Sequence, residues 1–320
     1  MRPLRAGAAA PYLEAHAWGS PTPVIESGLR ASYGTASMPL ISQLVFYPIK
    51  SCAGISLSSA TLTGAGLMHE HIYDREWMLV DDAGNFLTQR EYPKMALIEP
   101  RLRSDTMELR APGMLRLEIP LDLPDPEHAP TREVRLWQHV LKAYDCDDLT
   151  RTWFSRLLGV SCHLVRFHPD AHHPVNPART GGMEIGTLFA DGYPLLLIGT
   201  AALDELNDRL LAQGRAALTM DRFRPNIVIA DAPAHEEDHA ARLLIGQSEL
   251  RPVKPCPRCP IPSIDQRTGE PGPDPLDILR TYRTGVGGID GIAFGMNCIV
   301  TRGEGEVLRV GQEVELELAF

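Results

Sequence analysis

The sequence has no long run of apolar residues. Across its 320 residues, no window approaches the roughly 18 apolar positions of a membrane-spanning helix. The richest runs, such as YPLLLIG, have the length of a strand. An N-terminal stretch with the apolar core of a secretory signal peptide is also missing. We therefore expect a protein that needs no membrane and is cytoplasmic.

Positive charge is scarce as well. The chain has 31 Lys and Arg against 41 Asp and Glu, which gives a formal net charge of −10. A protein that binds nucleic acid by neutralising phosphates usually has a basic surface, and this balance argues against one. We expect no nucleic-acid partner, and any anionic ligand must be held by locally placed Lys and Arg side chains.

Cysteines are few and irregularly spaced. Six cysteines in 320 residues do not form the dense disulfide framework of small secreted proteins. Only Cys256 and Cys259 are close in sequence, within the stretch KPCPRCPIPSIDQRTGE at 254–270. In a reducing compartment, a C-x-x-C pair usually serves metal or redox chemistry.

What remains is a chain rich in short strands. Residues 1–37 are rich in Ala, Gly, Ser and Pro without periodicity, and we expect a poorly ordered extension there. Residues 38–165 alternate apolar and polar positions, with turn signals at Ala83-Gly84 and Pro112-Gly113, which predicts a small β-barrel domain with a helix at 148–159. Prolines in 168–180 predict a loop between two halves. Residues 175–320 read as a second β-rich domain, with helices at 201–212 and 274–283. The expected fold class is mixed α+β, rich in strands.

Three functions remain open for the cysteine pair. A structural zinc site needs four ligands, and no second pair at workable spacing is evident. A thioredoxin-type dithiol would open a helix at its first cysteine, but Pro260 and Pro262 oppose a helix there. The third is a loop that presents one thiolate beside Arg258, whose charge favours the ionised thiol and can hold an anion. A soft thiolate suits a sulfur-loving metal centre.

Seven separated motifs resemble one known family. The chain is similar to MOSC-domain proteins, and within them to the amidoxime-reducing component group and its bacterial relatives. The motifs follow the family's order: YPIKSCAGI at 47–55, YDREWMLVD at 73–81, FLTQREYPKMALI at 86–98, FADGYPLLLI at 189–198, FRPNIVI at 223–229, KPCPRCPI at 254–261 and FGMN at 294–297.

The resemblance implies a fold, a cofactor and a set of site residues. The fold is a MOSC β-barrel core packed against a β-rich N-terminal domain, with molybdenum cofactor, a Mo-molybdopterin, in the cleft between them. Cys259 matches the protein ligand to molybdenum, whereas Cys256 matches a supporting thiol. The implied cofactor contacts are Lys50, Ser51, Arg75, Gly192, Tyr193, Arg224, Asn226, Pro257, Arg258 and Asn297.

The resemblance also implies an activity. The family's amidoxime-reducing group reduces small N-hydroxylated compounds, such as amidoximes, hydroxylamines and N-hydroxylated bases, to amines or amidines. This sequence contains no C-x4-C-x2-C ferredoxin run. We therefore expect electrons from a separate ferredoxin, flavoprotein reductase or cytochrome. The alternative is a non-catalytic module that binds molybdenum cofactor and assists its sulfuration.

Overall fold

The computed structural model describes residues 38–125 and 127–319, and this part of the chain is rich in strands. It contains nineteen strands, four α-helices and five short 3-10 helices. The β-rich α+β fold class expected from the sequence is therefore confirmed. The expectation of a poorly ordered segment at 1–37 lies outside the described residues.

The largest sheet combines strands from both halves of the sequence. Its order is β19-β15-β16-β17-β13-β14-β1-β2, with only β13 and β14 parallel among its pairs. Its strands are β1 (Leu40–Phe46), β2 (Ile55–Leu57), β13 (Leu195–Gly199), β14 (Ile227–Ala230), β15 (Ala240–Ile245), β16 (Ser248–Pro257), β17 (Ala293–Arg302) and β19 (Glu315–Leu318). The first strand of the described chain, β1, is thus paired with β14, whose residues lie more than 180 positions later.

Three smaller sheets complete the strand inventory. A four-stranded sheet has the order β10 (Thr131–Leu136), β11 (His139–Asp145), β12 (His163–Phe167), β6 (Trp77–Val80). A second has the order β18 (Val307–Arg309), β3 (Ser59–Thr63), β4 (Gly66–His69), β5 (Ile72–Tyr73). The third joins β7 (Glu99–Leu102), β8 (Thr106–Arg110) and β9 (Leu117–Pro120), and the predicted Pro112-Gly113 turn connects β8 to β9. The pairing of β18 with β3 brings another late segment to the first half, and the division at 38–165 and 175–320 stays a prediction.

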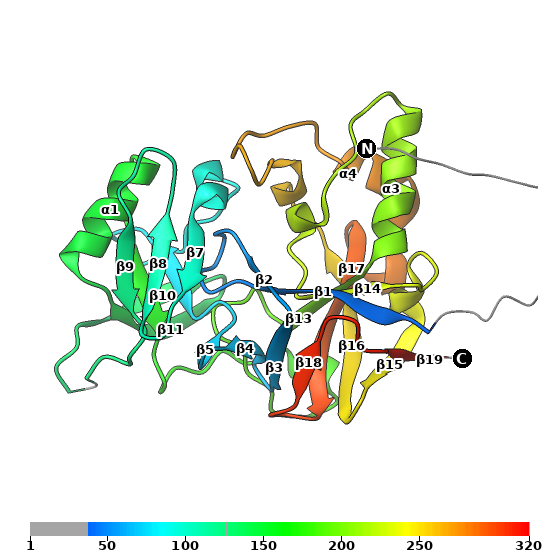
Figure 1. Cartoon of the computed structure of the whole chain (residues 1–320), viewed down its shortest axis with the longest axis horizontal. Helices are drawn as coiled ribbons and strands as arrows, with labels where there is room; N and C mark the ends of the chain where they lie inside the picture. The colour runs from blue at the N-terminus through cyan, green and yellow to red at the C-terminus, as the bar shows by residue number, and fades with distance from the viewer. Residues whose placement is uncertain (1–37, 126, 320) are drawn as a thin grey trace, which may run out of the picture. The chain divides into compact units, whose positions relative to one another are not determined.

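Helix α1 (Asp148–Leu158) begins and ends where the sequence indicates. It is capped by Asp147, whose side chain accepts a 2.8 Å hydrogen bond from the Thr150 N–H, and it stops at Gly159, which has a left-handed φ of 74°. Helices α3 (Thr200–Ala212) and α4 (Leu276–Arg283) contact each other (Figure 1). Helix α3 also contacts strands β13 and β14, and helix α4 contacts strand β17. The predicted loop at 168–180 is partly wrong, because Pro177–Thr180 forms the one-turn helix α2, started by Asn176 and its following proline.

The five 3-10 helices are short segments in the connections between longer elements. They are η1 (Pro93–Leu97), η2 (Met220–Phe223), η3 (Glu236–His239), η4 (Ile261–Ser263) and η5 (Val286–Gly288). Of these, η2 and η4 contact each other and flank the cysteine segment.

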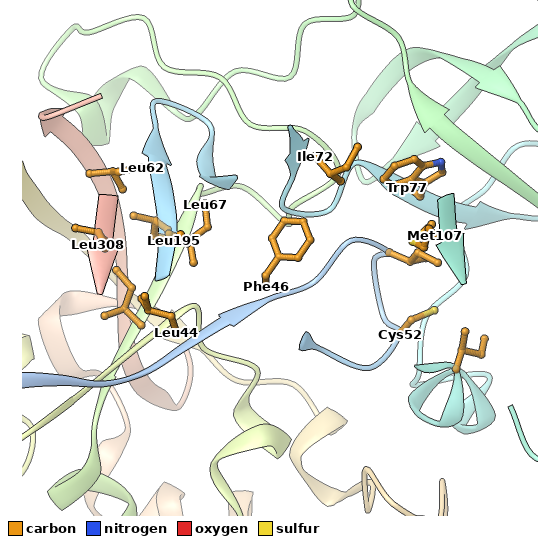
Figure 2. Packing of buried hydrophobic residues seen from close by; sticks show 14 of the residues in the cluster. Leu44, Phe46, Cys52, Leu62, Leu67, Ile72, Trp77, Met107, Leu195 and Leu308 are labelled. Carbon is orange, nitrogen blue, oxygen red and sulfur yellow. The ribbon is translucent and has the colours of Figure 1, made fainter. Parts of the chain in front are cut away.

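One hydrophobic cluster runs through the strands of both halves. Figure 2 shows Phe46 of β1 with Leu195 and Leu308 on one side and Trp77 and Met107 on the other. All five side chains are at most 1% exposed, and burying a side chain of this size contributes roughly 1.5–3 kcal/mol. Because β1 lies inside this cluster, the chain segments that follow it are held against the second half.

Candidate functional site

A single pocket gathers every site residue predicted from the sequence. It encloses about 250 Å³ and is lined by segments from both halves of the chain. The predicted residues in its wall are Lys50, Ser51, Arg75, Gly192, Tyr193, Arg224, Asn226, Pro257, Arg258, Cys259 and Asn297. The roles assigned to these residues stay predictions, but their positions converge on one cavity.

Three of these residues have an unusual backbone conformation. Ser51, Arg75 and Arg224 have φ angles of 64°, 53° and 57°, in the left-handed region that residues with a side chain rarely adopt. Such positions cost on the order of 1–3 kcal/mol each and persist only where neighbouring contacts hold them. Arg75 is held on both sides, because its N–H donates to the Tyr47 carbonyl at 2.7 Å and its carbonyl accepts from the Phe189 N–H at 3.0 Å. The turns at these positions lie in the pocket wall.

Two of the four predicted cations have carboxylate partners. Lys50 Nζ lies 2.6 Å from Asp191 Oδ1 and donates to the Phe189 carbonyl at 2.9 Å. Arg75 pairs with Asp74, whose other oxygen accepts a 2.8 Å hydrogen bond from the Tyr47 N–H. Burial lowers the pKa of Lys50, partly offset by Asp191. Desolvation acts to raise the pKa of Asp191, but Lys50 and a hydrogen bond from Trp137 lower it to about 2.

The other two cations lack such partners. Within residues 38–125 and 127–319, neither Arg224 nor Arg258 forms an ion pair with a carboxylate. Arg224 Nη2 and Arg258 Nε are both buried without a hydrogen-bond partner in that part of the chain. Burial lowers the pKa of Arg224. A buried donor without an acceptor is costly, so this side of the pocket is suited to an anionic ligand.

The two predicted asparagines differ in how much of their hydrogen-bonding capacity is used. Asn226 is 1% exposed; its Oδ1 accepts from Arg75 Nη1 at 3.1 Å and the Leu196 N–H at 3.2 Å, while its Nδ2 donates to the Val45 carbonyl at 3.2 Å. Asn226 therefore links β1, β13 and Arg75. Asn297 lies in β17 opposite Leu196 and Lys254, and its side chain makes no hydrogen bond to the described residues. Its amide is available to a ligand.

The two thiols of the C-x-x-C segment both line the pocket. Cys256 is near the end of β16, and its Sγ accepts a 3.3 Å hydrogen bond from Arg258 Nη1. The sequence placed Arg258 beside one thiolate, and the structure pairs it with Cys256. Cys259 is a free, half-buried thiol that precedes the 3-10 turn η4, and no α-helix starts at either cysteine. Among the described residues, no group of three or more His, Cys, Asp or Glu side chains is arranged to hold a metal ion.

Sequence reasoning missed several residues of the wall. Asp191 and Lys254 line the pocket, and both lie inside motifs already recognised, FADGYPLLLI and KPCPRCPI. Tyr47, in the first motif, does not line this pocket but lies under two of its cations: its ring centroid is 4.4 Å from the Arg75 guanidinium and 4.3 Å from that of Arg224. Burial raises the pKa of Tyr47 to about 12. The signal for all three was their position within three residues of a predicted contact, inside a recognised motif.

The fold and this pocket define a protein of two β-rich parts with a cation-lined and thiol-lined cavity between their segments. Residues 38–161 match the MOSC N-terminal beta barrel domain and residues 185–315 match the MOSC domain. The chain therefore belongs to the family of proteins that join these two domains, as the seven motifs predicted.

Curated relatives of known name are similar over most of the chain. Mitochondrial amidoxime-reducing component 1 of Mus musculus is 34% identical over 251 residues, which cover 76% of this chain and 71% of the relative. Mitochondrial amidoxime reducing component 2 of Bos taurus is 32% identical over 249 residues, covering 76% of this chain and 72% of the relative. Human molybdenum cofactor sulfurase is 30% identical over 264 residues, covering 78% of this chain but 29% of that protein.

Two of these relatives carry a cellular location in their names. The two amidoxime-reducing components are named as mitochondrial, so the predicted cytoplasmic location stays a prediction. In the described part of the chain, no helix has both the length and the apolar character needed to cross a membrane.

Proposed function

We propose that this protein is a molybdenum-cofactor-dependent oxidoreductase that reduces N-hydroxylated compounds to amines or amidines. One observation carries the proposal: a half-buried free thiol, Cys259, shares a pocket with two arginines that form no ion pair with a carboxylate in the described part of the chain. The names of the relatives, amidoxime-reducing components and a molybdenum cofactor sulfurase, support the same chemistry.

The residues present fit such a cofactor. Arg224 and Arg258 offer buried guanidinium donors without acceptors, which is the donor set that a phosphate accepts. Asn297, with its uncommitted amide, can both donate to and accept from the edge of a pterin ring. Cys259 would be the protein ligand to the metal, because a soft thiolate suits molybdenum. Cys256 accepts one hydrogen bond from Nη1 of Arg258, which also donates through Nη2 to the Phe223 carbonyl, and Cys256 would not be a ligand to the metal.

The protein's own contribution is to bind, orient and balance charge. When bound, molybdenum cofactor supplies two-electron chemistry that accepts the hydroxyl oxygen of the substrate. Lys50 and Arg75, each paired with a carboxylate, would present N–H donors in fixed positions in the wall. Asp191, with a pKa lowered to about 2, stays ionised at neutral pH and keeps Lys50 in place. Electrons would come from a separate ferredoxin, flavoprotein reductase or cytochrome.

The alternative function is a module that binds molybdenum cofactor and assists its sulfuration without turnover. The similarity to human molybdenum cofactor sulfurase favours this alternative. The two functions share the pocket and differ in whether an N-hydroxylated compound is consumed. Catalysis with an artificial electron donor separates them.

The test is to express the protein in a host that makes molybdenum cofactor and to measure molybdenum and zinc per chain. Wild type is compared with Cys259→Ala and with the matched variant Cys256→Ala. We expect near-stoichiometric molybdenum that is lost or made labile only in Cys259→Ala, and reduction of benzamidoxime by wild type with reduced viologen. Molybdenum without turnover would favour the carrier function. Zinc lost equally in both variants, without molybdenum, would contradict both functions.

A further inference from the structure

An exposed tryptophan, Trp137, lies beside the pocket on the β10–β11 hairpin of the first half of the chain. Trp137 is the first residue of the two-residue connection between β10 and β11, whose last pair is Leu136 with His139. Its φ is 55°, a left-handed value that is rare for a bulky residue. A two-residue hairpin turn favours this conformation, but glycine or asparagine normally supplies it. Because tryptophan rarely adopts this backbone conformation, contacts of its side chain are expected to hold it there.

The contacts of Trp137 point to the pocket. Its indole Nε1–H donates a 3.1 Å hydrogen bond to Oδ1 of Asp191, which lines the pocket. Phe86 meets the ring edge to face at a centroid distance of 4.8 Å, and the Arg90 guanidinium lies 5.0 Å from the ring centroid. Even so, Trp137 remains 46% exposed. The ring is therefore fixed in orientation while much of its surface is left open.

Asp191 has one oxygen engaged and one free. Oδ1 receives both Lys50 Nζ and Trp137 Nε1, whereas Oδ2 receives no donor from the described residues. The side chain of Asp191 is 72% exposed. A free carboxylate oxygen next to a fixed aromatic ring forms a two-part recognition surface: the ring packs against a planar apolar group, and the oxygen accepts N–H donors.

We propose that Asp191, in the pocket wall, and Trp137, hydrogen-bonded beside it, form a substrate-recognition surface at the edge of the pocket that selects aryl amidoximes, whose ring packs on the indole while the amino group donates to Asp191 Oδ2. This inference rests on the proposed function and names the substrate class that the site prefers. Trp137 is a specificity-determining residue, because it touches the substrate's ring and not the reacting N–O bond. A small aliphatic amidoxime would use Asp191 alone.

The test compares aryl and alkyl ligands on the molybdenum-loaded protein. Binding of the products benzamidine and acetamidine is measured by titration calorimetry, and KM and kcat are measured for benzamidoxime and acetamidoxime. Trp137→Ala removes the ring, Trp137→Phe keeps a ring but loses the N–H donor, and Val140→Ala, exposed on the same hairpin, is the matched control.

We expect Trp137→Ala to weaken benzamidine binding and to raise KM for benzamidoxime by up to about tenfold, which is the range of one aromatic packing contact. The affinity for acetamidine and the KM for acetamidoxime should stay within about twofold of wild type, because these ligands have no ring to pack. The same limit should hold for kcat and for the molybdenum content. Trp137→Phe should keep most of the aryl preference, and Val140→Ala should match wild type. Benzamidine should also quench tryptophan fluorescence in wild type but not in Trp137→Phe.

Equal losses for the aryl and alkyl ligands, or loss of molybdenum in Trp137→Ala, would overturn the assignment. So would an unchanged aryl preference in Trp137→Ala. A failure of the proposed function looks different: wild type would bind benzamidine with the expected dependence on Trp137 and still not reduce benzamidoxime with a strong donor.

Discussion

Arg75 donates a 3.1 Å hydrogen bond to Asn226, a residue 151 positions later in the chain. The amide that receives it is also bonded to Leu196 of β13 and Val45 of β1. One buried side chain therefore sets both the strand arrangement around the pocket and the orientation of a guanidinium in its wall. We therefore expect stability and cofactor binding to be coupled at this position.

Asn226→Ala should lower both stability and cofactor content. Removing the amide leaves the half-buried Leu196 N–H and Val45 carbonyl without the partner that Asn226 supplies, at a cost of up to roughly 1–3 kcal/mol for each group. The matched control is Asn207→Ala, because Asn207 also bonds reciprocally to a backbone, at Leu218, with distances of 2.7 and 3.0 Å. Chemical denaturation and molybdenum analysis should show that both variants lose stability and that only Asn226→Ala loses cofactor. Equal cofactor content in the two variants would contradict the coupling.

Arg224 offers a way to separate backbone strain from ligand binding. Because its φ is 57°, replacement by glycine relieves a conformation that alanine keeps, and Arg224→Gly should be more stable than Arg224→Ala by about 1 kcal/mol. Both variants lose the unpartnered guanidinium and should lose cofactor equally. Thermal unfolding checks the difference in stability between the two variants, and molybdenum content checks the loss of cofactor independently. Retention of cofactor in either variant would mean that Arg224 does not hold the anion.

The reactive thiols should be those of the pocket. Burial raises the pKa of Cys52 and Cys146 to about 12, and it also raises the pKa of Cys162 and Cys298. Thiolates react and thiols do not, so these four should be unreactive until the protein unfolds.

A colorimetric thiol reagent at neutral pH checks this. It should label two cysteines per chain in the native cofactor-free protein and six in denaturant. Loading with molybdenum cofactor should protect one of the two, and mass spectrometry should identify it as Cys259. Rapid native labelling of any of the other four would contradict the burial argument.

Glu237 should make stability depend on pH. It is fully buried in η3, its Oε1 accepts a 3.1 Å hydrogen bond from the Gly199 N–H, and its Oε2 has no partner among the described residues. Burial raises its pKa from 4.5 to about 7. The folded state therefore holds a proton that the unfolded state releases, and its contribution to stability is present below about pH 4.5 and lost as the pH rises through about 7.

Glu237→Gln removes this proton exchange. As the pH rises from 5 to 8, the wild type should lose roughly 1–3 kcal/mol of its free energy of unfolding relative to the variant, since each pKa unit corresponds to about 1.4 kcal/mol. Glu236→Gln, a half-exposed neighbour on the same turn, is the control. Denaturation curves at pH 5 and pH 8 give the free energy of unfolding of each protein. Equal changes with pH in wild type and Glu237→Gln would contradict the role of Glu237.

Local chemistry in the sequence predicted the elements that depend on nearby residues. Asp147 and Gly159 set the ends of α1, because a cap needs only a side-chain acceptor at one end and a left-handed residue at the other. Pro260 and Pro262 argued against a helix at the cysteine pair, and the structure has a strand end and a 3-10 turn there. The motifs also named the residues that converge on the pocket, although not their partners.

Only the tertiary structure decided which groups meet. Pairing of β1 with β14, and the bond from Arg75 to Asn226, join segments far apart in sequence, and no local propensity encodes such contacts. The same holds for charge: four similar cations in the sequence become two that are neutralised by Asp74 and Asp191 and two that are left for a ligand. Trp137, which carried no signal on its hairpin, gained a role only when folding placed it beside Asp191. A side chain's identity limits what it can do, but its burial and its neighbours decide which of those interactions it makes.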